Sequence, residues 1–384
     1  MTNQTAITLD ELLDRNSEIH ALKSVREMKP VAGFELPVYP PTYSGVPGYA
    51  IAKIDDNGGN VVVLDSVASS ANRIERQFKE DERIKDLHPQ VTVVFKGEGG
   101  DYEYNVLDVG HRIADASVRA SSLSGRIQKA FEAAMGGNHA EIARLCPAAL
   151  LFGVWDSRVT HHKKQRAMRS EIMARDVSPL DGPKQYFATV HKDTGLDYGS
   201  LGVVNDDPDA TADGEAKPAA NSGEAKGGKE KKASAFGLAN ASPKTEAAKH
   251  RGGVLVKGGI TWGMTLSMAM VRSYRGADAN ETEALQRYLL GLGVVAMTLP
   301  PREGLRSGCD LVLNGREQMG VKTISVYGEE VPLNVTLDEA IQFTKDAAAE
   351  LDIVREEQAE LTHDHLKEWV RDKKEETKKP GAKE

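Results

Sequence analysis

Three features of the sequence predict an α+β fold. Residues 61–65 (VVVLD) form a short apolar run that ends at a helix-capping position, which is typical of a strand followed by a helix. Residues 260–270 (ITWGMTLSMAM) place a large apolar side chain at every second position, which is the clearest strand pattern in the chain. Residues 280–297 repeat apolar side chains at helical spacing. Strands and helices mixed along one chain in this way favour an α+β class.

The first part of the chain predicts a helix, a loop, a strand, a second helix and a hairpin. A helix is expected over 8–28, because apolar side chains recur at helical spacing, namely Leu9, Leu12, Leu13, Ile19 and Leu22. Residues 37–48 are rich in proline and glycine and predict a loop. The strand at 61–65 leads into a helix that Asp65 or Ser66 can cap. Residues 91–107 predict a hairpin around glycine-rich turn residues.

The rest of the chain predicts helices from 111 to 144, a buried strand at 148–155 that includes Trp155, and further strands at 260–271 and 309–313. A charged amphipathic helix is expected over 338–384. Residues 205–250 are low in large apolar side chains and predict a flexible insertion. Without the insertions, the order is two β-α-β halves, which is the skeleton of a ferredoxin-like fold.

Composition restricts the class of protein. The chain has 384 residues, a net charge of −8 and 40% hydrophobic residues, so it can bury a large core. The two cysteines, Cys146 and Cys309, argue for a reducing compartment and against a disulfide framework or a cysteine metal site. The N-terminus lacks the apolar run of a signal peptide, and no run of about 18 apolar residues predicts a membrane span. We therefore expect a cytoplasmic protein without cofactor or metal.

The densest positive charge in this acidic chain follows the predicted strand at 148–155. Its cations are Arg158, His161, His162, Lys163, Lys164, Arg166 and Arg169. Arginine and lysine clustered in this way form a footprint for phosphates, and arginine adds planar donors that pair with phosphate oxygens. The alternative is a solvated loop, which is the usual meaning of a charge run. The contrast with the acidic chain favours binding.

Three further stretches carry polar side chains next to predicted strands or helices. Residues 64–75 crowd a strand-to-helix junction, where a helix N-terminus favours anions, although an N-cap followed by a surface face explains them without a ligand. Residues 108–116 offer His111 and Asp115 for acid–base or metal chemistry, but no second histidine stands at ligand spacing. Arg306 either binds a phosphate or lies in a turn before a strand. Motifs of serine hydrolases, P-loops and zinc proteases are absent.

Taken together, five stretches resemble a known family. They are DSVASSANRIE, GHRIADA, CPAALLFGVWDSR, RAMRSEIMARDV and LRSGCDL, in this order along the chain. They are similar to the backbone subunit of the CRISPR Cascade complex of subtype I-G, formerly I-U, in the RAMP superfamily (the seventh Cas family). The resemblance covers about 60–180 and 250–315, and the block from Leu150 to Ile172 is its most specific part.

The resemblance implies an RRM-like palm with inserted finger and thumb elements that binds guide RNA without catalysis. Together with the elements expected from the residue pattern, it divides the chain into an N-terminal helix and loop (1–48), a first palm half with fingers (49–180), a thumb and flexible insertion (181–259), a second palm half (260–337) and a charged C-terminal helix (338–384). The expected partners are the guide crRNA, the target DNA strand paired to it, other copies of the chain and other Cascade subunits. The expected RNA-binding residues are Ser66, Asn72, Arg73, His111, Arg112, Arg158, Lys163, Lys164, Arg166, Arg169, Ser170, Arg306 and Ser307.

Two alternatives stay open at this point. The first is a metal-dependent RNA endonuclease that uses Asp65, His111, Asp115 or Asp156. The second is a protein-interaction scaffold in which the helix at 338–384 binds a partner and RNA is incidental.

Overall fold

The chain folds around one large antiparallel sheet, which confirms the α+β class. The computed structural model describes residues 7–44, 46, 48–54, 59–97, 99–182, 197–204, 232–238, 251–302 and 304–378. The sheet has eight strands in the order β14-β13-β1-β11-β8-β3-β2, and β12 also pairs with β1. The strands are β1 (Ile19–Pro30), β2 (Ile51–Lys53), β3 (Asn60–Asp65), β8 (Met168–Arg175), β11 (Ile260–Ser267), β12 (Leu311–Leu313), β13 (Val321–Ser325) and β14 (Glu330–Leu333).

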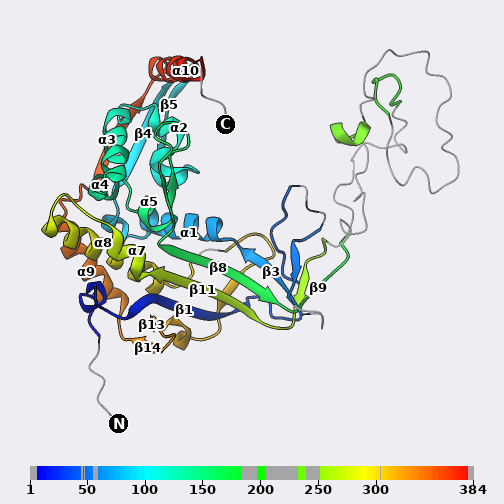
Figure 1. Cartoon of the computed structure of the whole chain (residues 1–384). Helices are drawn as coiled ribbons and strands as arrows, with labels where there is room; N and C mark the ends of the chain where they lie inside the picture. Colours follow the sequence, from blue (N-terminus) through cyan, green and yellow to red (C-terminus); the bar gives the residue numbers. More distant parts are fainter. Residues whose placement is uncertain are drawn as a thin grey trace, which may run out of the picture.

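Helices cover one face of this sheet (Figure 1). They are α1 (Val67–Glu80), α7 (Met268–Ser273), α8 (Ala279–Thr298) and α9 (Leu337–Glu350). Two glycines bring α8 close to its neighbours. A Cβ at Gly293 would lie 2.6 Å from the Leu266 side chain of β11, and one at Gly291 would lie 2.4 Å from Thr344 Oγ1 of α9. These close approaches pack α8 between the sheet and α9.

The strands alternate between the two faces of the sheet, as the period of two requires. In β8, Met168, Ser170, Ile172 and Ala174 point to the helices and are buried, while Arg169 and Arg175 are exposed on the opposite face. The alternation therefore separates Arg169 from Ser170, its neighbour in sequence.

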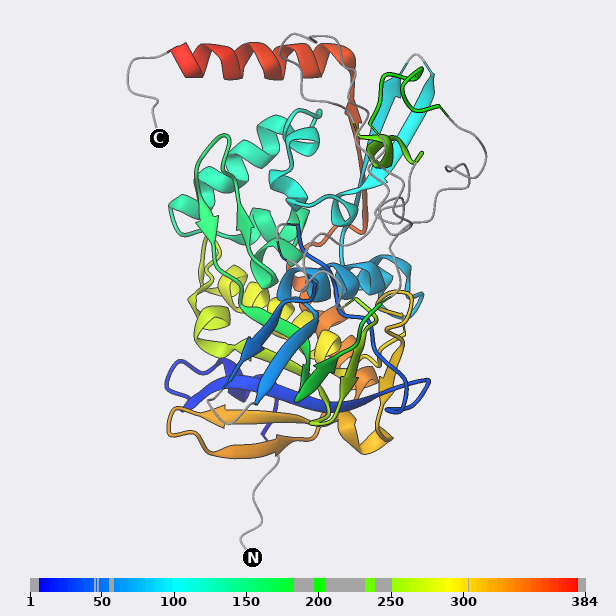
Figure 2. The same cartoon turned by 90° about the vertical axis from the view of Figure 1, so that its right-hand side faces the viewer.

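A second lobe rises above the helices (Figure 2). Its three-stranded sheet has the order β15-β4-β5, in which β15 (Glu356–Leu361) runs parallel to β4 (Gln90–Gly97), and β4 pairs antiparallel with β5 (Gly100–Asn105). The helices of this lobe are α2 (Ala116–Arg119), α3 (Ser124–Met135), α4 (Ala140–Leu145) and α5 (Ala148–Leu151). The final helix α10 (His363–Lys378) lies at the end of this lobe that is farthest from the large sheet.

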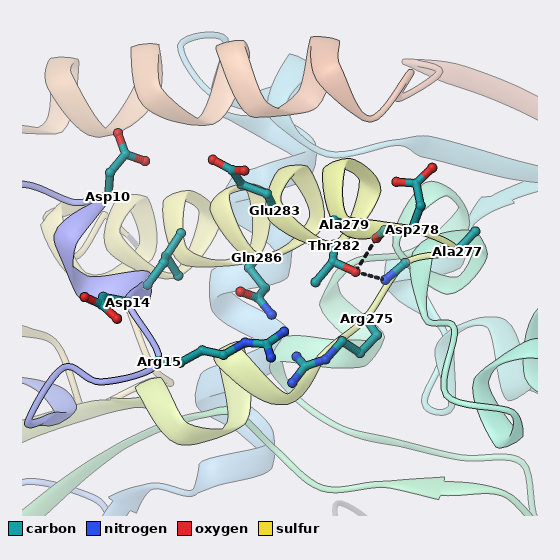
Figure 3. A pocket seen from close by; sticks show the side chains of 12 residues that line it. Asp10, Asp14, Arg15, Arg275, Ala277, Asp278, Ala279, Thr282, Glu283 and Gln286 are labelled. Carbon is teal, nitrogen blue, oxygen red and sulfur yellow. Dashed lines mark hydrogen bonds between the residues drawn. The ribbon is translucent and has the colours of Figure 1, made fainter.

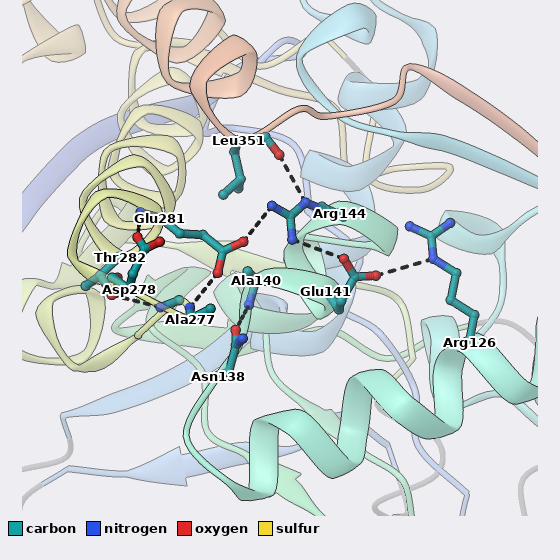
Figure 4. Close-up of polar contacts among 11 residues, drawn as sticks. Arg126, Asn138, Ala140, Glu141, Arg144, Ala277, Asp278, Glu281, Thr282 and Leu351 are labelled. Atoms are coloured by element: carbon teal, nitrogen blue, oxygen red, sulfur yellow. Dashed lines mark hydrogen bonds and ion pairs between the residues drawn. The ribbon is translucent and has the colours of Figure 1, made fainter.

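A network of ion pairs joins the two lobes (Figure 4). Arg144 of α4 pairs with Glu281 of α8 at 2.6 Å, pairs with Glu141 at 3.0 Å, and donates to the carbonyl of Leu351 at 3.1 Å. Arg126 of α3 reaches Glu141 at 3.4 Å. One arginine thus ties the helical lobe to the ends of both α8 and α9.

The helix predicted over 8–28 is wrong. Residues 11–13 form a 3-10 turn (Glu11–Leu13), and the chain then enters β1, which lies between β13 and β11 in the sheet. The apolar–polar alternation typical of a strand is interrupted in β1, because two inward positions are polar. They are Ser24 and Arg26, which are 1% and 0% exposed. N-terminal residues are therefore part of the large sheet rather than a separate helix.

Arg26 is buried because it caps the end of α8. Its Nη1 donates to the carbonyl of Leu299 at 2.8 Å, and its Nη2 donates to the carbonyl of Met297. The guanidinium lies 4.8 Å from the ring centroid of Trp262. A cation at a helix C-terminus is favourable, and burial lowers the pKa of this arginine to about 10.

The strand predicted at 148–155 is also wrong. Residues 148–151 form the short helix α5, and only Val154 and Trp155 are extended, as strand β6. A short apolar run fits a buried helix as well as a strand, so its period does not decide between them. Trp155 is 56% exposed, not buried.

Other predictions agree with the structure or are extended by it. The strand at 61–65, the helix after it, the hairpin at 91–107, the helix at 280–297 and the strand at 309–313 correspond to β3, α1, β4–β5, α8 and β12. The strand expected over 260–271 ends at Ser267, where α7 begins. The tail is not one helix, because β15 separates α9 from α10.

The predicted insertion at 205–250 lies mostly outside the described residues. It is bracketed by the pair β9 (Val177–Pro179) and β10 (Val254–Val256). Among the described residues near it, Tyr198 and Ala233 form a small buried cluster of their own, and Tyr198 donates to the carbonyl of Leu238 at 2.9 Å. Over the described part of the chain, no helix is long and apolar enough to cross a membrane.

Candidate nucleic-acid interface

The cationic run forms a short hairpin with an ordered turn. Its strands are β6 (Val154–Trp155) and β7 (Lys163–Lys164), paired antiparallel. Asp156 holds the turn together, because its Oδ2 accepts bonds from the backbone N–H of Thr160 at 3.0 Å and from Thr160 Oγ1 at 2.8 Å. The backbone N–H of Asp156 also donates to the carbonyl of His162 at 2.9 Å. The turn is therefore fixed by its own bonds.

The two faces of the hairpin differ in exposure. Trp155 and Lys163 are opposite each other and exposed, and the Lys163 ammonium lies 5.7 Å from the Trp155 ring centroid. Val154 and Lys164 share the inner face. Lys164 is half-buried, which also lowers its pKa, so Lys163 is the more accessible of the two lysines. Arg158, at the tip of the turn, is exposed, and its carbonyl accepts from Lys373 Nζ of α10 at 2.6 Å.

Two arginines fix the chain that leads into the hairpin. Arg112 Nη1 donates to the carbonyl of Gly153 at 3.0 Å, and Arg166 Nε donates to the carbonyl of Phe152 at 3.1 Å. Arg112 also forms a two-pronged ion pair with Glu75 of α1, with its Nη2 at 2.8 Å from Oε2. The Glu75 carboxylate is only 1% exposed. Its pKa is raised by burial, and Arg112 opposes that rise. Arg112 is therefore committed to a buried pair.

Beneath the hairpin lies a buried polar cluster. Arg119 and Asp156 are 2% and 0% exposed, with Nη2 and Oδ2 3.6 Å apart. His139 is buried next to Tyr274, and burial lowers its pKa to about 4, with the nearby Lys164 adding to the effect. The cluster keeps Asp156 in place and so anchors the turn that presents Arg158.

A second group of predicted residues lies where β3 meets α1. Ser66 caps α1, as expected, and accepts from the backbone N–H of Ser69 at 3.3 Å. Arg73 pairs with Asp65 at 3.2 Å and donates to the carbonyl of Leu305 at 2.9 Å. Arg306 donates to the carbonyl of Leu64 at 2.7 Å. These arginines hold the loop at 304–306 against the end of β3.

The remaining predicted residues differ in their exposure. Asn72, His111 and Ser307 are exposed. Ser170 is 2% exposed and bonds to Ser70 Oγ at 2.6 Å and to the indole N–H of Trp262 at 2.8 Å, so it lies in the core. Arg169 pairs with Glu171 at 2.8 Å on the uncovered sheet face. The predicted set therefore lies on several surfaces, and within it the hairpin is where exposed cations gather.

The sequence interpretation missed Trp155 as a functional candidate. It was assigned to the core because it ends an apolar run, although the cations that follow it indicate a position exposed to solvent. Its exposure makes it an aromatic surface within a cationic patch, which is the combination that single-stranded nucleic acids recognise.

The four residues of the predicted nuclease site do not come together as a metal site. Asp65 is buried against Arg73, and Asp156 is buried against Arg119. Asp115 caps α2 by accepting from the backbone N–H of Ser117 at 3.1 Å. Across the residues that the structure describes, no group of three or more His, Cys, Asp or Glu side chains is placed to hold a metal ion.

The hollow between α8 and the 3-10 turn at 11–13, of about 630 Å³, contains none of the predicted residues (Figure 3). In it Arg15 and Arg275 face Gln286, with Asp14 and Glu283 nearby. Gln286 Nε2 donates to the carbonyl of Tyr274 at 2.8 Å, so the Gln286 side chain stabilises the adjacent loop. Charges of both signs line this hollow, and it does not select one ligand class.

Residues 22–179, from β1 through the hairpin to β9, match a family of CRISPR-associated proteins. The matching family model is that of CRISPR-associated protein GSU0053. This confirms the resemblance to a CRISPR-associated family that the sequence indicated. The match begins within β1, which the sequence interpretation had placed outside the family region.

The chain is similar to the crystal structure of Csc2 from Thermofilum pendens, with 10% identity, coverage of 91% of this chain and 82% of that chain, and a TM-score of 0.27. No curated protein matches the sequence.

Proposed function

We propose that the chain is a non-catalytic backbone subunit of a type I-G Cascade complex that binds guide RNA along its phosphates. The observation that carries this proposal is the exposed cationic hairpin β6–β7, built into an acidic chain and lying inside the region that matches a CRISPR-associated family. Cations that meet phosphates bind RNA regardless of sequence, and base pairing with a target strand then supplies specificity.

The strand order supports an RRM-like palm. Four strands in the order β13-β1-β11-β8 have the arrangement 4-1-3-2, with α1 on the connection from β1 to β8 and α8 on the connection from β11 to β13. This is the order of a ferredoxin-like fold. In this proposal the palm begins at Ile19 rather than at 49, the fingers are the lobe of β4, β5 and β15, and the thumb extends from the β9–β10 pair.

The proposal includes the partners that the resemblance implies. They are the guide crRNA, the target DNA strand paired to it, further copies of the chain and other Cascade subunits in the cytoplasm. The acidic remainder of the chain favours binding that is confined to the cationic patch, because like charge repels phosphates elsewhere.

The test is assembly on a guide RNA. The chain is co-expressed with and without the guide, and size-exclusion chromatography with light scattering and absorbance at two wavelengths reports mass and RNA content. The proposal predicts a large species with protected RNA only when the guide is present. A chain that stays free of nucleic acid in both preparations, even with the other Cascade subunits present, contradicts it.

A variant without the two exposed hairpin cations sharpens this test. Replacing Arg158 and Lys163 by alanine should reduce the slope of log K against log salt by about 0.7 for each phosphate that the variant no longer neutralises. The matched control replaces Lys129 of α3 and Lys345 of α9, two exposed lysines outside the hairpin, and should leave the slope unchanged. Equal slopes in both variants would show that RNA binds elsewhere.

A further inference from the structure

Trp155 is a large aromatic side chain that the fold leaves in solvent. Its side chain is 56% exposed, whereas Trp262, in the sheet, is 6% exposed. Covering an exposed large apolar side chain is favourable, because fully burying one gives roughly 1.5–3 kcal/mol. Lys163 lies over the ring at 5.7 Å from its centroid and leaves much of the indole open.

The backbone around Trp155 is held from both sides. Gly153, two residues before it, accepts a bond from Arg112, and Asp156, the next residue, is buried and organises the turn. Gly153 has a φ of +86°, and a Cβ there would lie 3.2 Å from the carbonyl of Lys164, so the hairpin starts from a tight backbone position. The indole is therefore presented from a rigid support, which reduces the entropy lost when a ligand orders it.

We propose that Trp155 is a stacking platform for an unpaired base of single-stranded RNA, and that Lys163 and Arg158 hold the phosphates next to that base. The ring supplies a flat apolar face, and the flanking cations supply the charge that a sugar-phosphate backbone requires. Every base has a π face, so this contact is tolerant of sequence. The inference rests on the proposed RNA binding and adds a contact to the base, which the cations alone do not provide.

The experiment compares two oligomers that differ only in their bases. Fluorescence anisotropy measures binding of the full chain to a labelled single-stranded oligo(A) and to an oligomer of equal length with abasic ribose in place of each nucleotide. Stacking on an aromatic side chain is worth about 1–3 kcal/mol per base, which corresponds to a change in affinity of about 5-fold to about 150-fold. Trp155→Ala should weaken binding to oligo(A) by this factor and leave binding to the abasic oligomer unchanged.

Two further variants separate stacking from a disturbed fold. Trp155→Phe keeps an aromatic face and should retain most of the affinity for oligo(A). Tyr327→Ala removes a 76% exposed aromatic side chain from the β13–β14 turn and should change nothing. Neither Trp155→Ala nor Trp155→Phe should alter the salt slope, because no charge is removed.

The outcomes separate the stacking proposal from the RNA-binding proposal. If Trp155→Ala binds oligo(A) as tightly as the unchanged chain, or weakens both oligomers equally, stacking is refuted while RNA binding stands. If the unchanged chain binds neither oligomer and no guide-containing complex forms, the proposed function fails and the stacking contact fails with it.

Discussion

The buried pair of Arg112 and Glu75 gives the sharpest test of what one predicted RNA contact does. The resemblance assigns Arg112 to RNA, whereas the structure commits its guanidinium to a carboxylate that is 1% exposed and to the carbonyl of Gly153. Arg112→Ala leaves the Glu75 charge buried without its partner. Breaking a buried ion pair in this way lowers the free energy of unfolding by about 3–5 kcal/mol.

The effect of Arg112→Ala should depend on pH in a direction set by Glu75. Burial already raises the pKa of Glu75, and Arg112 opposes that rise, so Arg112→Ala raises the pKa further. The folded state then binds a proton that the unfolded state releases, and stability falls as pH rises between the two pKa values. The deficit of Arg112→Ala should therefore be largest near neutral pH and shrink as pH is lowered. Adding Glu75→Gln should recover a large part of it at neutral pH.

Urea unfolding followed by circular dichroism at two pH values measures these differences. Arg169→Ala is the matched control, because its pair with Glu171 is exposed on the arginine side, and exposed pairs contribute about 0–1 kcal/mol. A decrease below about 1 kcal/mol in Arg112→Ala, together with weaker RNA binding, would refute the structural role and support direct contact with RNA.

Three further predictions concern stability. Arg26→Met removes the donors that cap α8, leaves the carbonyls of Met297 and Leu299 without them, and should lower the free energy of unfolding by about 2–4 kcal/mol in urea titrations. Lowering the pH from 6.5 to about 4 should lower the free energy of unfolding, because burial holds the pKa of His88 and His139 at about 4 while the unfolded imidazoles protonate near 6.5. In His88→Gln the free energy of unfolding should depend less on pH over this range. An unchanged dependence on pH would contradict this account. Truncation after Thr362 removes α10 but keeps β15, and it should leave the melting temperature nearly unchanged. Truncation after Glu350 also removes β15 and should lower the melting temperature. Equal melting temperatures for the two truncated chains would show that β15 does not stabilise the lobe.

The sequence predicted the elements whose pattern is not interrupted by polar residues in the core. The strand β11 and the helix α8 were found because every inward position of the strand is apolar and the helix carries a long apolar face. The strand β1 was not, because Ser24 and Arg26 point inward and break the alternation of apolar side chains. Nothing local in the sequence indicates that an arginine will cap a helix that begins far later in the chain.

The candidate site was predicted in composition but not in geometry. The cationic run lies in one short hairpin, and this hairpin exposes Arg158 and Lys163. The period of two then placed Ser170 in the core and Arg169 on the uncovered sheet face. The role of Arg112 depends on Glu75 in another helix, and such a tertiary partner is not visible in a single sequence.

The parallel pairing of β15 with β4 has a consequence for how the chain matures. The strand β4 leaves the ribosome long before its parallel partner at 356–361, because the two strands are far apart in the sequence. Contacts between such distant segments form late and slowly. During synthesis one edge of β4 therefore lacks its backbone partner until residues 356–361 have left the ribosome, and the incomplete lobe is a natural substrate for chaperones until then.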